Sequence, residues 1–231
     1  MVVLVHGIFS SRNEDGRFVR LAAHLAKHGF NSARFDQRCH GDSPEPKLRI
    51  SADNHVLDLI AVLHAAGARA SAVCLVASSY GAAVALLAAS LDSFPKPGRV
   101  VLLNPVVAFD YVFLEPRTAG MVDRFTPEIR RQLSCMQPVE MLNGVVITPQ
   151  FWLQLQRMDP ARGLRVLAKS SLVVHGDADT LVDYHETRRR CLAAGVAGFH
   201  TIAGADHAFD EPAAEAESFR VITEWLELSG A

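Results

Sequence analysis

The stretch Ala72–Gly81, with the sequence AVCLVASSYG, decides the fold expected for this chain. Its first six residues are apolar without polar alternation, a pattern typical of a strand buried on both faces of a parallel sheet. Two serines and a glycine frame a turn, and a helix pattern begins at Tyr80. A buried strand that turns sharply into a helix is the unit from which α/β proteins are built. We therefore expect the rest of the chain to alternate strands and helices.

The same alternation extends in both directions from this stretch. Short apolar runs rich in valine predict further strands at Val2–Val5, Ser32–Phe35, Val100–Leu103, Leu172–Val174 and Phe199–Ile202. Helix-like periodicity separates them, at Arg17–His28, Ala52–Ala66, Glu186–Ala194 and Ala213–Leu228. Such alternation predicts a doubly wound, mostly parallel α/β sheet of about six strands, with ligands bound where the strands end.

The alternation stops after Pro105, and roughly 60 residues pass before the next strand, which is too long for a plain crossover. This stretch contains helical patterns and many aromatic and methionine residues. We therefore expect a helical cap insertion, residues 107–167, over a core formed by residues 1–106 and 168–231. The cap's apolar residues either contact a substrate or only hold the insertion on the core, and both readings stay open.

Composition excludes several classes of protein. Of 231 residues, 49% are hydrophobic and 21% are charged, so the chain can bury a large core and is not expected to be disordered. A net charge of -2 offers no electrostatic footprint for nucleic acid or for an anionic membrane. The longest apolar run, Ala82–Ala89, is far shorter than the roughly 20 residues of a transmembrane helix. Since the start of the chain lacks a signal-peptide pattern, we expect a cytoplasmic protein.

The four cysteines of the chain are far apart in the sequence and form no CxxC pair. Neither a zinc site nor a disulfide framework is therefore indicated, and unpaired thiols in a reducing compartment are expected.

Ser79 is the candidate nucleophile of the turn in Ala72–Gly81. A serine on a strained strand-to-helix turn is exposed above the sheet, and the residues two before and two after it must be small. Ala77 and Gly81 satisfy this around Ser79, whereas a turn centred on Ser78 would place bulky side chains at both crowded positions.

A serine needs a base and an orienting carboxylate, and both follow later in the chain. His207 comes after the last predicted strand, and the loop after Leu172–Val174 offers three aspartates. Asp177 suits a role in fixing the turn through its own backbone, and Asp183 suits a helix N-cap. The order Ser, Asp, His is that of one hydrolase architecture.

The first strand supplies the remaining part of the candidate site. It ends in His-Gly, and the next backbone N–H, that of Ile8, can point at developing negative charge. Together with the N–H of Tyr80 it would form an oxyanion hole. Phe9, next to Ile8, and Phe151 and Trp152 in the cap are the candidate substrate contacts.

These features together resemble the α/β-hydrolase superfamily over nearly the whole chain. The segment HGDADTLV, residues 175–182, is similar to the family pattern H-G-x-x-D, whose last residue falls on Asp179 and implies that this aspartate is the third member of the triad. The segment 34–43 is similar to the family turn R-G-H-G-x-S, with Cys39 at its middle glycine, and implies a structural role for His40. Within the superfamily, the layout is most similar to small bacterial carboxylesterases of the cinnamoyl or feruloyl esterase type.

The chain departs from the family pattern at its start. Members usually begin with an antiparallel hairpin before the strand that ends in His-Gly, whereas this sequence starts in that strand. We expect the sheet to lack the hairpin and to have six strands, and a truncated sequence would explain the difference equally well. The exposed sheet edge could pair with another chain, so a homodimer is an open alternative.

The expected function is that of a serine hydrolase that cleaves a small to medium acyl or aryl carboxylic ester through an acyl-enzyme on Ser79. His207 would be the general base and then the general acid, and Asp179 would orient it. No metal and no organic cofactor is required, and the expected partner is a small-molecule ester. Thioester hydrolysis, acyl transfer and C–C bond hydrolysis use the same triad, and a ligand-sensing role without turnover is the non-enzymatic alternative.

Overall fold

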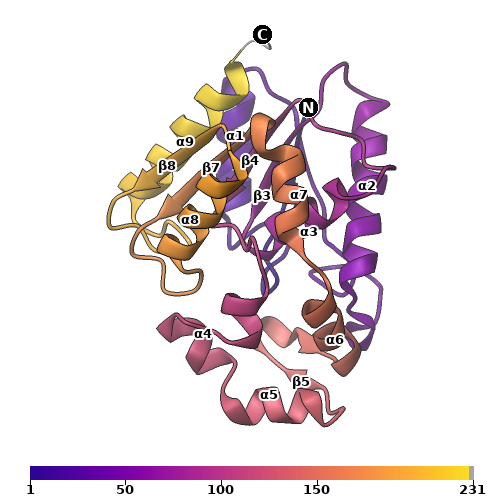
Figure 1. Cartoon of the computed structure of the whole chain (residues 1–231). Coiled ribbons are helices and arrows are strands. Elements are labelled where there is room, and N and C mark those ends of the chain that lie inside the picture. Colours follow the sequence, from indigo (N-terminus) through magenta and orange to yellow (C-terminus); the bar gives the residue numbers. More distant parts are fainter. Residues whose placement is uncertain (229–231) are drawn as a thin grey trace.

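Six parallel strands form one sheet in the computed structural model, which describes residues 1–228 (Figure 1). The strands are β1 (Val2–Val5), β2 (Ser32–Arg34), β3 (Cys74–Ser78), β4 (Arg99–Leu103), β7 (Ser171–Gly176) and β8 (Gly198–Ile202). Their order in the sheet is β2-β1-β3-β4-β7-β8, and every neighbouring pair is parallel. The predicted fold class is therefore confirmed.

Helices cover both faces of the sheet because its central strands are apolar on both sides. Val2 and Leu4 point into one apolar cluster and Val3 and Val5 into another, and all four are fully buried. The first cluster lies under α1 (Arg17–Lys27) and α9 (Pro212–Glu227), and the second under α2 (Ala52–Gly67), α3 (Tyr80–Ala89), α7 (Pro160–Leu167) and α8 (Tyr184–Ala194). None of the helices in the described residues is long and apolar enough to cross a membrane.

The strand order reverses its direction beside β1. From β1 the chain moves to β2 on one side, and then to β3 and onward on the other side. Ligands of doubly wound sheets bind in the crevice outside the carboxyl ends of the strands at such a reversal. In this chain those ends are the residues after Val5 and after Ser78, so the topology brings the His-Gly segment and Ser79 to one crevice.

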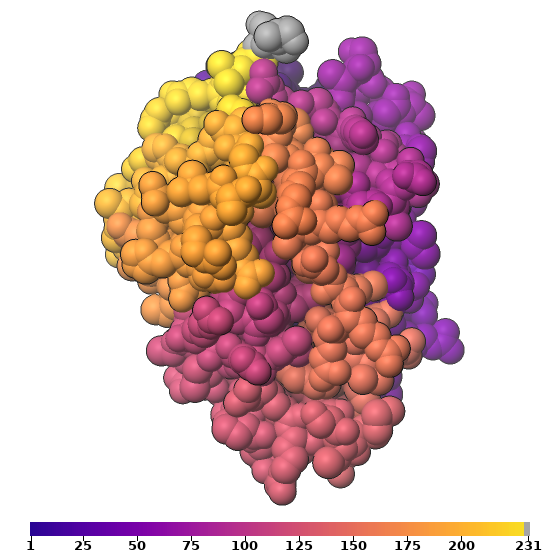
Figure 2. Space-filling view, in the orientation of Figure 1, coloured from indigo at the N-terminus to yellow at the C-terminus, as the bar shows by residue number. Residues whose placement is uncertain are grey.

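Residues 110–157, between β4 and β7, form a group of short elements beyond one end of the sheet (Figure 1). They are η2 (Asp110–Leu114), α4 (Ala119–Arg124), α5 (Pro127–Ser134), β5 (Val139–Glu140), η3 (Leu142–Gly144), β6 (Val146–Ile147) and α6 (Pro149–Arg157). In the space-filling view they make up the lower end of the molecule (Figure 2). The antiparallel β5–β6 pair, α4 and η2 are elements that the hydrophobic pattern did not predict.

Helices α5, α6 and α7 begin with the same local device. Thr126, Thr148 and Asp159 each accept a hydrogen bond from a backbone N–H of the first turn, and proline follows each of them. An oxygen-bearing side chain at the N-cap and proline at the first helical position together favour a helix start.

Helix α7 packs along α3 at very close range. A Cβ atom added to Gly163 would lie 1.7 Å from the Leu86 carbonyl oxygen. The last helix of the range 107–167 thus lies against the helices that cover the sheet, whereas the elements before it lie beyond the strand ends. The division into core and cap remains a prediction.

Candidate active site

Ser79 lies at the sharp turn between β3 and α3. Its backbone has φ 53° and ψ -120°, a strained conformation for a residue with a side chain. Its N–H donates to the Leu103 carbonyl oxygen at 2.8 Å, which ties the turn to β4. A Cβ atom at Gly81 would lie 2.6 Å from the carbonyl oxygens of both Val5 and His6. The turn therefore requires glycine at this position, where the sequence pattern predicted a small residue.

The neighbouring Ser78 is committed to another contact. Its side chain is buried, and its Oγ accepts a hydrogen bond from the Arg17 guanidinium at 2.7 Å. Arg17 also donates to Glu14 at 3.1 Å and to the Ala208 carbonyl oxygen at 3.0 Å. This buried arginine therefore connects the first loop, the turn before Ser79 and the loop that carries His207.

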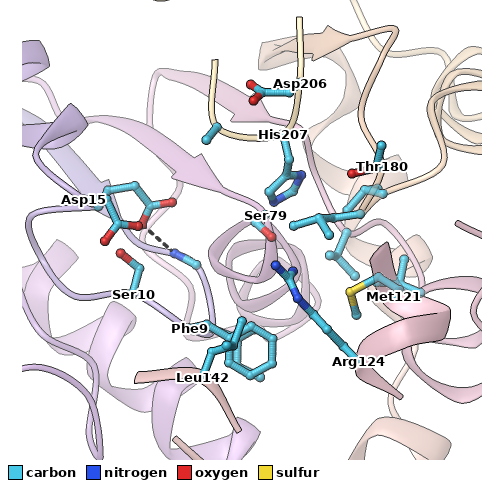
Figure 3. A pocket seen from close by; sticks show the side chains of 18 of the residues that line it. Phe9, Ser10, Asp15, Ser79, Met121, Arg124, Leu142, Thr180, Asp206 and His207 are labelled. Atoms are coloured by element: carbon cyan, nitrogen blue, oxygen red, sulfur yellow. Dashed lines mark hydrogen bonds between the residues drawn. The ribbon is translucent and has the colours of Figure 1, made fainter. Parts of the chain in front are cut away.

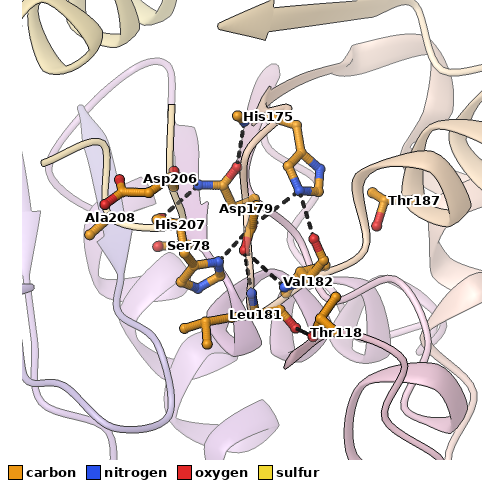
Figure 4. Close-up of polar contacts among 12 residues, drawn as sticks. Ser78, Thr118, His175, Asp179, Leu181, Val182, Thr187, Asp206, His207 and Ala208 are labelled. Carbon is orange, nitrogen blue, oxygen red and sulfur yellow. Dashed lines mark hydrogen bonds and ion pairs between the residues drawn. The ribbon is translucent and has the colours of Figure 1, made fainter. Parts of the chain in front are cut away.

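The structure brings Asp179 and His207 together (Figure 4). The Nδ1 atom of His207 lies 2.7 Å from Oδ2 of Asp179, whose side chain is fully buried. The other oxygen, Oδ1, accepts hydrogen bonds from the backbone N–H groups of Leu181 and Val182 at 2.7 and 2.9 Å. Because Nδ1 is bound to the carboxylate, the Nε2 atom of His207 is left for a substrate or a serine.

His175 makes a second contact with the same carboxylate. Its Nε2 lies 3.2 Å from Oδ2 of Asp179, and its ring is fully buried. Burial alone would raise the pKa of Asp179, but the attraction of His207 and the hydrogen bonds from both histidines outweigh it and hold that pKa well below its usual range. Asp179 is therefore a carboxylate at neutral pH.

Asn104, directly after β4, connects the loop that carries His207 with the loop that carries Asp179. Its side-chain amide donates to the His207 carbonyl oxygen at 2.6 Å, and its Oδ1 accepts from the Gly176 N–H at 2.9 Å. The roles of Asn104 and His175 were not predicted from the sequence. Their positions at strand ends, in the dipeptides Asn-Pro and His-Gly, were the only local signals.

Hydrogen bonds hold the His-Gly loop on both sides of Ile8. The Gly7 N–H donates to Oε2 of Glu14 at 2.9 Å, and the Gly7 carbonyl oxygen accepts from Nδ1 of His6 at 2.7 Å. The Ile8 carbonyl oxygen lies 2.7 Å from Nε2 of His40, which gives His40 the structural place that the resemblance implied. The backbone around Ile8 is therefore fixed before any ligand binds.

Tyr80, whose N–H is the other candidate donor, is fixed through its side chain. The ring is fully buried, and its hydroxyl lies 3.0 Å from Nδ1 of His55, whose Nε2 donates to the Arg38 carbonyl oxygen. Burial lowers the pKa of His55 from its ordinary 6.5 to about 3, and that of His6 to about 4. Both rings are neutral at physiological pH, so they act as hydrogen-bonding groups and not as charges.

A cavity of about 380 Å³ opens above Ser79 and His207 (Figure 3). Ile8 and Phe9 line it from the first loop. Segments between β4 and β7 supply part of the apolar wall, with Val112, Phe113, Met121 and Leu142. The volume lies at the lower end of the range typical of pockets for small organic ligands.

Phe151 and Trp152 do not line this cavity. The fully buried Phe151 ring packs against Tyr80 and His55, and Trp152 stacks on Phe125 at a centroid distance of 6.0 Å. Of the three predicted substrate contacts, the structure brings only Phe9 to the cavity. Within residues 1–228, no cluster of His, Cys, Asp or Glu side chains is arranged to hold a metal ion.

The model of the alpha/beta hydrolase family matches residues 2–218, so the chain belongs to this family. No curated protein sequence matches it significantly.

Solved structures of similar architecture include a protein with ferulic acid bound and a lipase. The structure of Est1E from Butyrivibrio proteoclasticus with ferulic acid bound aligns with a TM-score of 0.80 at 18% identity, over 97% of this chain and 87% of that one. The monoacylglycerol lipase of Paleococcus ferrophilus aligns with a TM-score of 0.70 at 21% identity, over 97% and 93%. At such identities these likenesses show the shared fold.

Proposed function

We propose that this chain is a serine hydrolase that cleaves a carboxylic ester of small to medium size through an acyl-enzyme on Ser79. The observation that carries the proposal is the 2.7 Å contact between His207 and the buried carboxylate of Asp179, on the wall of the cavity into which Ser79 opens. A serine, a histidine and a carboxylate in this order and arrangement are the parts of a nucleophile with its base.

In the proposed reaction, Nε2 of His207 takes the proton of the Ser79 hydroxyl while the serine oxygen attacks the ester carbonyl. Asp179 holds the ring with the Nδ1 proton toward itself and stabilises the imidazolium that forms. The developing oxyanion accepts hydrogen bonds from the N–H groups of Ile8 and Tyr80. The imidazolium then protonates the leaving alcohol, and water, activated by the same histidine, releases the acid and restores the serine.

The substrate class follows from the size and lining of the cavity. About 380 Å³ with a partly apolar wall fits an acyl or aryl group of modest size. Two structural neighbours, Est1E with ferulic acid bound and a monoacylglycerol lipase, favour ester substrates. Thioesters would form the same acyl-enzyme, so the test includes them.

The test is a panel of aryl esters with acyl groups of increasing length, each paired with its thioester, and measured as kcat/KM. Ser79→Ala should lower kcat by about 10⁴-fold or more, because it removes the oxygen that forms the acyl-enzyme. Ser78→Ala is the matched control: among residues 1–228, the hydroxyl of Ser78 accepts a hydrogen bond from Arg17 alone, so turnover should persist. Equal rates for wild type and Ser79→Ala would overturn the proposal, and absence of turnover on the whole panel would favour a ligand-sensing protein.

A further inference from the structure

Arg124 differs from every other arginine in the described part of the chain. It alone is shielded from solvent in part and has neither a hydrogen bond nor an ion pair with another residue. The two other arginines that line the cavity have carboxylate partners: Arg17 pairs with Glu14 at 3.1 Å, and Arg20 with Glu215 at 2.6 Å. The remaining arginines without partners, such as Arg117, are exposed to solvent. Arg124 therefore lacks the counter-charge that the fold supplies elsewhere.

The position of Arg124 is set by the loop that carries Asp179. Helix α4 starts on this loop, where the Gly120 N–H donates to the Thr180 carbonyl oxygen at 3.0 Å and the Thr118 hydroxyl donates to the Leu181 carbonyl oxygen at 2.9 Å. A Cβ atom at Gly120 would lie only 2.5 Å from the Leu181 side chain, so the approach is close. Arg124, at the other end of this short helix, points into the cavity toward Ser79 (Figure 3).

The surroundings of Arg124 make its isolation costly. The cavity that it lines also has the apolar side chains of Met121, Phe113 and Leu142 on its wall. Burial lowers the pKa of Arg124, and no nearby anion opposes that shift. The cavity's unpaired carboxylates, Asp15 and Asp206 among them, lie on the opposite side of Ser79 (Figure 3). A ligand anion would therefore be repelled from that side and attracted to Arg124.

We propose that Arg124 binds a carboxylate carried by the substrate, so that the preferred ester has a second, ionised carboxyl group. This inference rests on the proposed function and narrows its substrate class. A guanidinium presents a planar fork of donors that matches a carboxylate in two parallel hydrogen bonds. The carboxylate of the substrate would be the negative partner that Arg124 lacks within the described residues. Its binding would also hold the ester carbonyl over Ser79 at a fixed distance from the cap.

The test compares charged esters with neutral esters of the same shape, in two arms. The acyl arm pairs the 4-nitrophenyl monoester of adipic acid with the corresponding primary amide. The alcohol arm pairs 4-carboxyphenyl acetate with 4-carbamoylphenyl acetate. In one arm, wild-type kcat/KM should favour the carboxylate by about ten- to a hundredfold, the range expected for a charge-assisted hydrogen bond. The arm that responds shows which half of the ester carries the anion.

Three variants assign the preference to the side chain. The measured quantity is the preference for the charged ester, given by the ratio of kcat/KM for the charged and the neutral ester. Arg124→Met should abolish this preference, Arg124→Lys should keep part of it, and Arg117→Met, at an exposed position, should leave it unchanged. Dividing the wild-type ratio by the ratio of each variant cancels the intrinsic reactivities of the two esters, because the same pair is compared. Arg124→Met should also have a Tm equal to or above that of wild type, since it removes an unpaired, partly desolvated charge.

The outcomes separate this inference from the proposed function. Three results would overturn the role of Arg124 and leave the serine hydrolase intact, provided that the neutral esters are hydrolysed. They are no preference for either carboxylate ester, a preference that persists in Arg124→Met, and a Tm of Arg124→Met below that of wild type. Failure to hydrolyse any of the four esters would overturn both.

Discussion

Asp179→Asn is the substitution that the geometry makes most specific. Asp179 accepts four hydrogen bonds, two backbone N–H groups on Oδ1 and two histidine rings on Oδ2. Asparagine has one oxygen, and its NH₂ group must face one of these two pairs of donors. The backbone N–H groups can only donate, whereas the proton of a neutral histidine can lie on either ring nitrogen. The amide oxygen will therefore take the Oδ1 position, and the NH₂ group will face His207.

His207 must then present an unprotonated Nδ1 to this amide and carry its proton on Nε2. That is the nitrogen that has to accept the Ser79 proton, so the base is lost although the fold remains. We expect kcat to fall by about 10⁴-fold, which corresponds to about 5 kcal/mol of transition-state stabilisation.

Steady-state hydrolysis of an activated ester, with circular dichroism to verify the fold, measures this loss. Asp177→Asn is the matched control in the same loop: its exposed carboxylate accepts from the Gly204 N–H at 2.6 Å, and asparagine keeps that acceptor. It should retain kcat and lose at most about 1 kcal/mol of stability. A folded Asp179→Asn with kcat near wild type would refute the reasoning.

Two further predictions concern stability. Gly163→Ala should lower the free energy of unfolding, measured by urea titration, by about 3 kcal/mol or more, because the added Cβ would overlap the Leu86 carbonyl oxygen. Gly67→Ala is the control: this glycine ends α2 and has open space around the added Cβ, so the substitution should be neutral or stabilising. Unfolding should also depend on pH through His6 and His55, which the folded protein keeps neutral with pKa values of about 4 and about 3 while the unfolded chain protonates them below 6.5. Their contribution is complete above pH 6.5 and is lost as pH falls toward 4, by about 1.4 kcal/mol per pH unit for each ring; urea unfolding across this range that shows no such slope would contradict it.

The sequence predicted the sheet because its signal is local. Each central strand is a continuous apolar run, and burial on both faces requires such a run, as in Val2–Val5. The choice of Ser79 over Ser78 as the turn residue was also local, since it depended on the crowding that Gly81 relieves. Both predictions needed only neighbours in the chain.

The contacts that complete the candidate site could not be predicted in the same way. Arg17 meets Ser78 across 61 positions of sequence, and Asn104 meets His207 across 103. No periodicity signals such pairs, because they are set by which loops the topology brings together. Aromatic residues at helical spacing, such as Phe151, indicate a shared buried face but not what that face covers.

The most direct test of the central claim is covalent labelling with a fluorophosphonate, followed by peptide mass spectrometry. Only a serine with an adjacent base and oxyanion donors reacts strongly with this reagent. We expect one label per chain, on the peptide that contains Ser79. The label should be lost in Ser79→Ala, retained in Ser78→Ala, and formed far more slowly in Asp179→Asn. Modification at Ser78, or undiminished labelling of Ser79→Ala, would contradict it.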